Sequence, residues 1–143
     1  MIRRSGVLIA AIIVSSATLV FAARQEQKST GWTIPDNAAQ EKNPMADNPQ
    51  AITDGKQLFT QNCQHCHGPA GKGDGPDADP DFQDDMDLTV ASRAARNPDG
   101  VVFYKVWNGR AKPKMPKFGE KLSKDDIWKI VSYVQTLRQK AQQ

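Results

Sequence analysis

The chain has 143 residues, of which 38% are hydrophobic, and its mean hydropathy of −0.60 marks it as poor in core-forming residues. This length suggests one domain with extensions. The formal net charge of +3 falls to +1 when Arg3 and Arg4 are set aside with an N-terminal targeting segment, because 17 basic and 16 acidic residues remain. So small a net charge gives no basis for a nucleic-acid partner.

Residues 1–23 have the features of an export signal. A basic pair near the start precedes an apolar stretch at residues 6–23, and Val20 and Ala22 lie at the two positions that an export peptidase reads. The apolar run is about 17 residues long, the lower limit for a membrane span. The segment is therefore predicted to be a cleaved signal peptide or an uncleaved anchor that associates with the membrane. Either predicts that the rest of the chain is exported to the bacterial periplasm, soluble or anchored to the inner membrane.

Residues 24–50 are predicted to be an extended arm or linker. The segment is polar, and Pro35, Pro44 and Pro49 interrupt any regular element. Its one apolar island, Trp-Thr-Ile-Pro at residues 32–35, either packs as a strap on the domain surface or docks a partner.

The first helix of the folded domain is predicted to begin near Ile52 or Thr53 and to run into Cys63, with Thr53 as a candidate N-cap. Gly55 and Phe59 are i, i+4 neighbours on one face of this helix. A glycine inside a helix costs up to about 1 kcal/mol relative to alanine. Close approach of another helix at Gly55 would offset that cost.

Residues 63–67 read Cys-Gln-His-Cys-His and contain every cysteine and histidine of the chain. The pattern C-x-x-C-H is the attachment motif of c-type haem. Because each helical residue turns by about 100°, Cys63 and Cys66 share a face and suit two thioether bonds to one porphyrin edge. His67 lies within about 40° of Cys63 and can ligate the iron. One covalent haem c is therefore predicted, and it would add apolar surface to a small core.

Other uses of the cysteine pair fit the sequence less well. A structural zinc site needs about four ligands, and no second cluster completes such a shell. A thioredoxin-like pair expects a βαβ setting, whereas no alternating strand pattern appears. A disulfide at this spacing would close almost no loop.

Residues 68–76 are predicted to form a tight loop, because they include four glycines and two prolines. A backbone carbonyl there, with Pro76 as the candidate, could accept the free ring N–H of His67. Seven aspartates follow within residues 74–87. Their spacing lacks the glycine and glutamate of a calcium loop, so a solvated acidic loop is predicted. Leu88 is expected to pack against the haem edge.

Two helices are predicted between this acidic loop and residue 110. The first is a short one near residues 90–96. The second covers residues 98–108, with Asn97 as its cap, Pro98 at the first position and Gly109 at the C-terminal stop.

The last predicted helix follows Ser123, which with Asp126 resembles a capping box. An apolar stripe at helical spacing runs along it, and Arg138 belongs to its basic C-terminal end. The stripe consists of Ile127, Ile130, Val131, Val134 and Leu137.

Residues 110–118 are predicted to be an irregular basic loop, because two prolines interrupt them. Met115 lies there between lysines, where a thioether gains nothing from water, so it is the favoured candidate for the second axial ligand. Met86 in the acidic loop is the main alternative, followed by Met45, a lysine or water. Four cations of the loop either steer an acidic redox partner or only confer solubility: Arg110, Lys112, Lys114 and Lys117.

Together these features make the chain resemble the class I c-type cytochromes, specifically the bacterial monohaem type. The resemblance covers about residues 51–138. It is carried by Gly55, Phe59, the 63–68 motif, residues 71–76, Asp99-Gly100, Asn108-Gly109, Met115-Pro116, Trp128 and Tyr133.

The resemblance implies an all-α cytochrome c fold at residues 51–140. Three to five helices would wrap around one covalent haem, with the first and last helices crossing at Gly55. It also implies that His67 and Met115 are the axial ligands. One departure from the family pattern is Lys114, which places a charge near the haem edge.

The predicted function is one-electron transfer in an exported respiratory or photosynthetic-type chain, without enzyme activity. A His/Met iron has no open position for a substrate, and methionine raises the reduction potential. The expected partners are redox proteins with an acidic docking patch. The alternatives are a membrane-anchored haem subunit of a larger oxidoreductase complex and, less favoured, a peroxidase or gas sensor.

Overall fold

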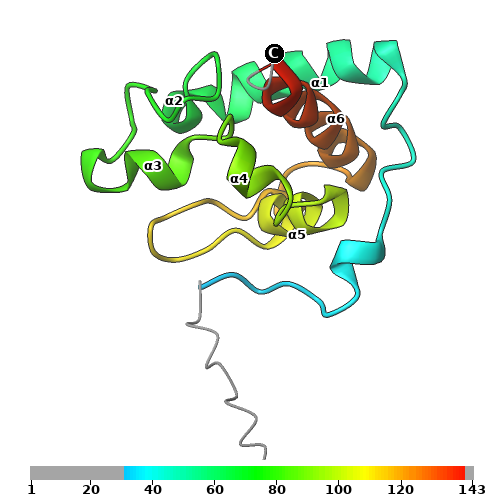
Figure 1. The fold of residues 1–143 in the computed structure, drawn as a ribbon, viewed down its shortest axis with the longest axis horizontal. Helices are drawn as coiled ribbons and strands as arrows, with labels where there is room; N and C mark the ends of the chain where they lie inside the picture. Colours follow the sequence, from blue (N-terminus) through cyan, green and yellow to red (C-terminus); the bar gives the residue numbers. More distant parts are fainter. Residues whose placement is uncertain (1–30, 141–143) are drawn as a thin grey trace, which may run out of the picture.

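The computed structural model of the protein describes residues 31–140. The predicted export signal lies outside these residues. The described part is all-α and contains no strand, which confirms the predicted fold class (Figure 1). Its α-helices are α1 (Pro49–Asn62), α2 (Gln64–His67), α3 (Gln83–Met86), α4 (Ala91–Ala94), α5 (Asp99–Asn108) and α6 (Lys124–Lys140). Three 3-10 turns join them: η1 (Ala38–Gln40), η2 (Pro80–Phe82) and η3 (Phe118–Glu120).

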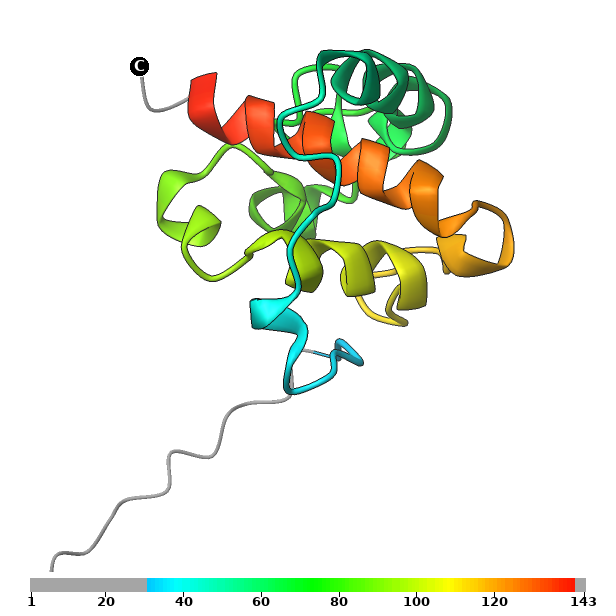
Figure 2. The same cartoon turned by 90° about the vertical axis from the view of Figure 1, so that its right-hand side faces the viewer.

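Helices α1 and α6 cross, as the family resemblance implied (Figures 1 and 2). Gly55 of α1 lies at the crossing point, where a Cβ atom would collide with the backbone carbonyl of Lys129 on α6. Phe59, one turn further along α1, is 1% exposed and meets Tyr133 edge to face, with ring centroids 5.3 Å apart. The glycine therefore allows the two helices to pack backbone against backbone.

Helix α1 begins at Pro49, three or four residues earlier than predicted, so Thr53 lies within the helix and does not cap it. The Asn48 side chain caps it by accepting hydrogen bonds from the backbone N–H groups of Gln50 and Ala51, at 2.9 and 3.2 Å. Pro49, interpreted from the sequence as an interruption of the arm, suits the first helical position because its missing N–H needs no partner there. The arm therefore gives way to the helix at Pro49.

Helix α5 also begins differently from the prediction. Pro98 is its N-cap, and Asn97 does not cap it, because the Asn97 amide donates to the Arg93 carbonyl and its oxygen accepts from Lys105. Gly109 ends the helix with φ +60°, in the region that favours glycine. The same helix contributes Phe103, which stacks on Trp128 of α6 with ring centroids 4.2 Å apart.

The predicted cap of α6 is present. The backbone N–H of Asp126 donates to the Ser123 hydroxyl at 3.1 Å, and that hydroxyl donates to the Asp126 carboxylate at 2.7 Å. The apolar stripe that follows forms the centre of the core, where Ile127, Ile130 and Val131 are fully buried.

The described part of the arm packs on the domain as a strap. The Asn43 amide donates to the Trp128 carbonyl and the Ser132 hydroxyl at 3.1 and 2.8 Å, and Ser132 donates to the Met45 carbonyl at 3.1 Å. Figure 2 shows the strap running down one side of the domain across α6 and on to η1. The apolar island also contacts the domain, because the Asn108 amide donates to the Thr33 carbonyl at 2.7 Å.

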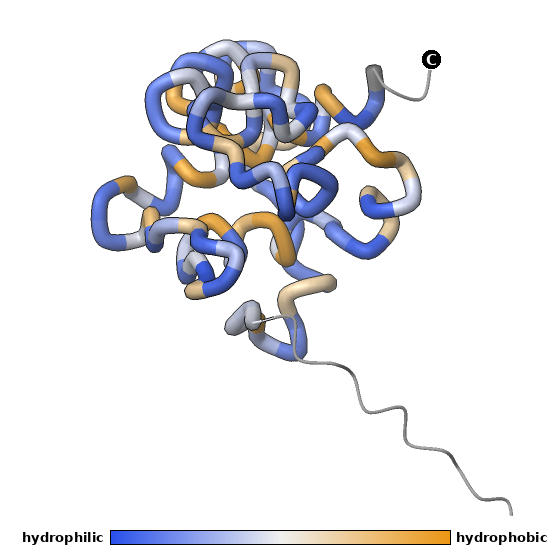
Figure 3. The backbone as a smooth tube through the Cα atoms, turned by 90° about the vertical axis from the view of Figure 1, so that its left-hand side faces the viewer, coloured by the Kyte–Doolittle hydropathy of each residue, from blue (hydrophilic) through white to orange (hydrophobic). Residues whose placement is uncertain are grey.

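Among residues 31–140, no helix combines the length and apolar character needed to cross a membrane. Figure 3 shows hydrophobic and hydrophilic segments alternating along the chain, as expected for helices with one buried face.

Candidate haem site

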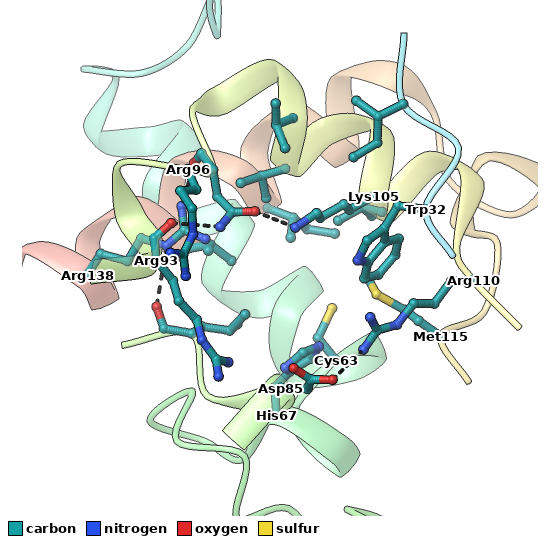
Figure 4. A pocket seen from close by; sticks show the side chains of 18 of the residues that line it. Trp32, Cys63, His67, Asp85, Arg93, Arg96, Lys105, Arg110, Met115 and Arg138 are labelled. Atoms are coloured by element: carbon teal, nitrogen blue, oxygen red, sulfur yellow. Dashed lines mark hydrogen bonds and ion pairs between the residues drawn. The ribbon is translucent and has the colours of Figure 1, made fainter. Parts of the chain in front are cut away.

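A cavity of about 740 Å³ lies between α1, α5, α6, the arm and the basic loop (Figure 4). Its size falls within the range of cofactor sites. Apolar side chains from three helices form much of its wall, among them Phe59, Val102, Val106, Ile130 and Val134. Leu88 also lines it, at the position predicted to meet the haem edge.

Cys63 and His67 reach this cavity from the junction of α1 and α2. Cys63 is the C-cap of α1, and its backbone N–H donates to the Phe59 carbonyl at 2.8 Å. The one-turn helix α2 then carries the chain to His67, whose ring lies 6.4 Å from that of Phe59. Both residues line the cavity, as predicted for a thioether position and an axial ligand.

Cys66 does not line the cavity. It is half-buried, and its Sγ contacts the backbone carbonyl of Asp77 at 3.7 Å. Burial raises the pKa of the Cys63 thiol to about 12 and also raises the pKa of the Cys66 thiol. Before attachment, both thiols are therefore protonated at neutral pH.

The ring of His67 is oriented by a backbone carbonyl, but by that of Met86 and not that of Pro76. The Nδ1 atom lies 2.7 Å from the Met86 oxygen. Because a carbonyl only accepts, Nδ1 carries the proton and Nε2 keeps its lone pair for a metal. Burial lowers the pKa of His67, Arg110 lowers it further, and the hydrogen bond to Met86 partly opposes them, so the ring is neutral at pH 7.

Pro76 lies elsewhere because the glycine-rich loop folds around the backbone of α2. Pro76 is exposed, and its neighbour Asp77 donates its N–H to the His65 carbonyl at 2.8 Å. Further along, Leu88 donates to the Gly71 carbonyl at 2.7 Å. This contact holds the end of the acidic segment against the loop and brings Met86 to His67.

Met115 lines the same cavity as Cys63 and His67. It is held by a pair of backbone hydrogen bonds with Arg110, each 2.9 Å long. Gly109 lies directly against this loop, because a Cβ atom there would meet the Met115 carbonyl. The rival methionines, Met86 and Met45, are absent from the lining of this cavity.

A cluster of cations lines another part of the cavity (Figure 4). None of them has a carboxylate within ion-pair distance among residues 31–140. The cluster consists of Arg93, Arg96, Lys105 and Arg138.

Neutral oxygens are the partners of this cluster instead. Arg138, only 6% exposed, donates to the carbonyls of Asn97 and Leu88 at 2.8 and 3.3 Å. Lys105 donates to the Asn97 side chain. Burial and three neighbouring guanidinium groups lower the pKa of Lys105 to about 8, and burial lowers that of Arg138.

This donor set fits a c-type haem. The porphyrin needs apolar walls, a thiol pair, an imidazole with a free nitrogen and a second axial donor. Its two carboxylates need cations, and buried cations without acidic partners meet that need. Of the required groups, only Cys66 is absent from the cavity lining.

Three residues of this site were not identified from the sequence. Lys105 was hidden within the apolar pattern of α5, and Trp32 was placed in an arm of uncertain role. Arg138 was interpreted as a partner of the helix dipole. It lies four residues after Val134, so its position on the apolar stripe was a readable signal.

The cations of the basic loop separate into two groups. Lys112, Lys114 and Lys117 are exposed. Arg110 is not free to dock a partner, because its side chain is 12% exposed, pairs with Asp85 at 3.4 Å and lies over Trp32 at 4.4 Å.

An all-α fold with a C-x-x-C-H motif opening onto a cofactor-sized cavity defines a haem-attachment protein. The family model described as Cytochrome c matches residues 52–138, more than half of the chain. The chain therefore belongs to the cytochrome c family, which implies a covalently bound c-type haem and haem-based electron transfer.

Solved structures similar to this chain include the following two. One is a reducing HAO-like protein complex of Kuenenia stuttgartiensis, with 31% identity, a TM-score of 0.55, and coverage of 63% of this chain and 44% of that chain. The other is cytochrome CL from the marine methylotrophic bacterium Methylophaga aminisulfidivorans, with 24% identity, a TM-score of 0.51, and coverage of 66% and 60%. The latter likeness shows the fold alone. The match spans less than two thirds of either neighbour's chain, and the comparison with curated proteins found no match.

Proposed function

We propose that the protein is a one-electron carrier with a single haem attached through Cys63 and Cys66, and with His67 and Met115 as axial ligands. The observation that carries the proposal is the shared cavity. It brings together a thiol, an imidazole with a free Nε2 and a thioether from sequence positions far apart. When bound, the haem supplies a one-electron Fe(III)/Fe(II) couple, whose potential an axial methionine raises.

The protein's own groups would bind, orient and shield this cofactor. Met86 fixes the tautomer of His67, which leaves Nε2 as the donor. Lys105 and Arg138 would hold the haem carboxylates. With both axial positions taken by side chains, no site remains for a substrate, so we propose that the protein is not an enzyme.

The docking surface that we propose consists of Lys112, Lys114 and Lys117. These three exposed cations flank the proposed ligand Met115 in the sequence. They would attract an acidic patch on a redox partner, in an encounter that is fast, weak and sensitive to salt.

We also propose export of the chain to the periplasmic side of a bacterial membrane. The proposal rests on the basic and apolar pattern of residues 1–23. Whether residues 6–23 are cleaved or remain as an anchor decides between a soluble carrier and a tethered one.

The axial assignment is tested by the spectra of Met115→Ala, with Met86→Ala as the matched control. We expect Met115→Ala to lose the ferric sulfur-to-iron charge-transfer band and to become high-spin or misligated. Met86 acts through its backbone carbonyl, so Met86→Ala should keep the band. The reverse pattern would identify Met86 as the ligand and overturn the assignment.

A second candidate function is that of a haem subunit in a larger oxidoreductase complex. It is favoured by the likeness to a chain of an HAO-like protein complex at 31% identity. A detergent-free wash of membranes from the native host tests the anchor that such a subunit would have: a soluble carrier is released, whereas an anchored protein, carrier or subunit, stays with the membrane.

A further inference from the structure

Trp32 reaches the cofactor cavity from a segment that lies before the matched family region. Its indole is half-buried and lies beside Arg110, whose guanidinium carbon is 4.4 Å from the ring centroid (Figure 4). The Lys105 ammonium lies 5.1 Å from the same centroid. Two cations at these distances fall within the range of a cation–π interaction.

The backbone next to Trp32 is also anchored to the domain. The Asn108 amide at the end of α5 donates to the Thr33 carbonyl at 2.7 Å. The segment that carries Trp32 is therefore fixed to Asn108. Asn108 directly precedes Gly109, where the loop that carries Met115 begins.

Arg110 joins three parts of the site. Its backbone pairs with Met115, and its Nε–H donates to the Pro113 carbonyl at 3.1 Å, so it fixes the loop that carries the proposed ligand. Its guanidinium also reaches Asp85 at 3.4 Å. Asp85 directly precedes Met86, whose carbonyl orients His67. The segments that place the two proposed axial ligands thus meet at Arg110.

The planar guanidinium of Arg110 can contact the Pro113 carbonyl and the Asp85 carboxylate together only in one orientation. Asp85 is 48% exposed, so its ion pair alone is weak in water. The indole of Trp32 supplies a flat face against the guanidinium and helps to exclude solvent from it.

We propose that Trp32 is a positioning residue for the axial ligands: it clamps Arg110, and Arg110 holds the Met115 loop against the segment that orients His67. Through Trp32 the arm would then contribute to the haem site and help to keep Met115 bound to the iron. This inference rests on the proposed function, because it requires Met115 to be the sixth ligand.

The test uses the purified ferric holoprotein with imidazole as a competitor for the sixth position. We expect Trp32→Ala to bind imidazole roughly fivefold more tightly than the wild type, the effect of losing one cation–π contact of about 1 kcal/mol. Its charge-transfer band should weaken. Trp32→Phe keeps an aromatic face and should restore most of the difference. Thr33→Ala is the matched control, because the Thr33 contact uses the backbone only.

A double-variant cycle tests the route through Arg110. Arg110→Lys keeps a positive charge for Asp85 but loses the planar group and its Nε–H. If Trp32 acts through Arg110, the two substitutions together should change imidazole affinity by clearly less than the product of the separate fold-changes. Full multiplicativity would overturn the proposed route.

An unchanged imidazole affinity and charge-transfer band in folded Trp32→Ala would overturn the inference and leave the carrier proposal standing. A purely structural tryptophan would lower only the unfolding temperature. Absence of the charge-transfer band from the wild type would overturn the axial assignment together with this inference.

Discussion

At the scale of single residues, the buried Arg138 and the half-buried Lys105 have no carboxylate within ion-pair distance in the described part of the chain. Arg138 and Lys105 face carbonyl and amide oxygens, and an uncompensated buried charge is costly. A pair of haem carboxylates would remove that cost. The arrangement explains why these cations lie on inner helix faces that otherwise carry valine and isoleucine.

The substitution Lys105→Met tests this role of the lysine. Removal of a cation beside the haem stabilises Fe(III), so the reduction potential should fall. We expect a change of about tenfold in the Fe(III)/Fe(II) equilibrium, which is about 59 mV for one electron. Potentiometric titration measures the change. Exposed Lys42→Met is the control and should leave the potential nearly unchanged.

The potential should also depend on pH through the same group. Burial and the nearby groups of Arg138, Arg110 and Arg93 lower the pKa of Lys105 to about 8, an effect that Asp85 partly opposes. A bound carboxylate moves the transition upward, so loss of this charge begins at or above pH 8. Loss of the positive charge stabilises Fe(III) relative to Fe(II). The reduction potential of the wild type should therefore fall as the pH rises through this range. A Lys105→Met variant with the same slope would contradict this prediction.

Residue positions in the site that follow from type and spacing were predictable from the sequence, whereas contacts that follow from loop geometry were not. The C-x-x-C-H motif identified Cys63 and His67, and Met115 was identified as a methionine without another use. All three line the same cavity. The prediction that Pro76 accepts the ring N–H of His67 was wrong. A glycine-rich loop has many allowed backbone paths, and no local sequence feature favours the Met86 carbonyl over that of Pro76. The contact between Cys66 and the Asp77 carbonyl was likewise not predictable, because it depends on the path of the loop.

At the scale of secondary-structure elements, the crossing of α1 and α6 determines where the motif opens. Gly55 lets α1 lie directly on the Lys129 carbonyl, and Phe59 then points toward Tyr133 and the cavity. Cys63 follows one turn later. The position of the haem-attachment motif is therefore tied to the helix contact.

The substitution Gly55→Ala should destabilise this crossing. The added Cβ meets backbone, which moves less easily than a side chain, so the free energy of unfolding should fall by about 3 kcal/mol, the upper end for overpacking. Denaturant unfolding of the holoprotein measures it. Exposed Lys56→Ala on the same helix is the control and should stay within about 0.5 kcal/mol of the wild type. Equal free energies of unfolding for Gly55→Ala and Lys56→Ala would contradict the prediction, because α1 and α6 could then move apart without loss of stability.

The sequence predicted the existence and the ends of the helices with different accuracy, for physical reasons. Periodic apolar stripes identified α5 and α6, and their ends were approximate because Asn97 makes contacts with other residues instead of capping. The start of α1 was missed because Asn48-Pro49 reads equally well as a turn and as a cap with its first residue. The one-turn helices α2 and α3 carry no periodicity long enough to detect.

At the scale of the whole molecule, positive charge has two separate roles. Arg93, Arg96, Lys105 and Arg138 line the cavity, whereas Lys112, Lys114 and Lys117 face solvent on the basic loop. The net charge of +3 does not reveal this division. We propose that the second group steers association with a partner.

Replacement of the three loop lysines by glutamate should slow oxidation of the ferrous protein by ferricyanide, an anionic probe. We expect the wild-type rate to fall as ionic strength rises and the variant to lose that dependence, because steering is electrostatic. Stopped-flow kinetics measures the rate. A variant with Lys42, Lys56 and Lys124 replaced by glutamate matches the change in net charge. Equal slowing of both variants would contradict a localised docking surface.

We propose that this chain holds one haem with His67 and Met115 on its iron and cycles it by one electron. A redox titration of the purified protein, followed by optical spectroscopy, tests the ligands and the electron count together. We expect a single reversible one-electron transition, with a sulfur-to-iron charge-transfer band in the ferric state that disappears on reduction. A high-spin ferric spectrum without that band would contradict it.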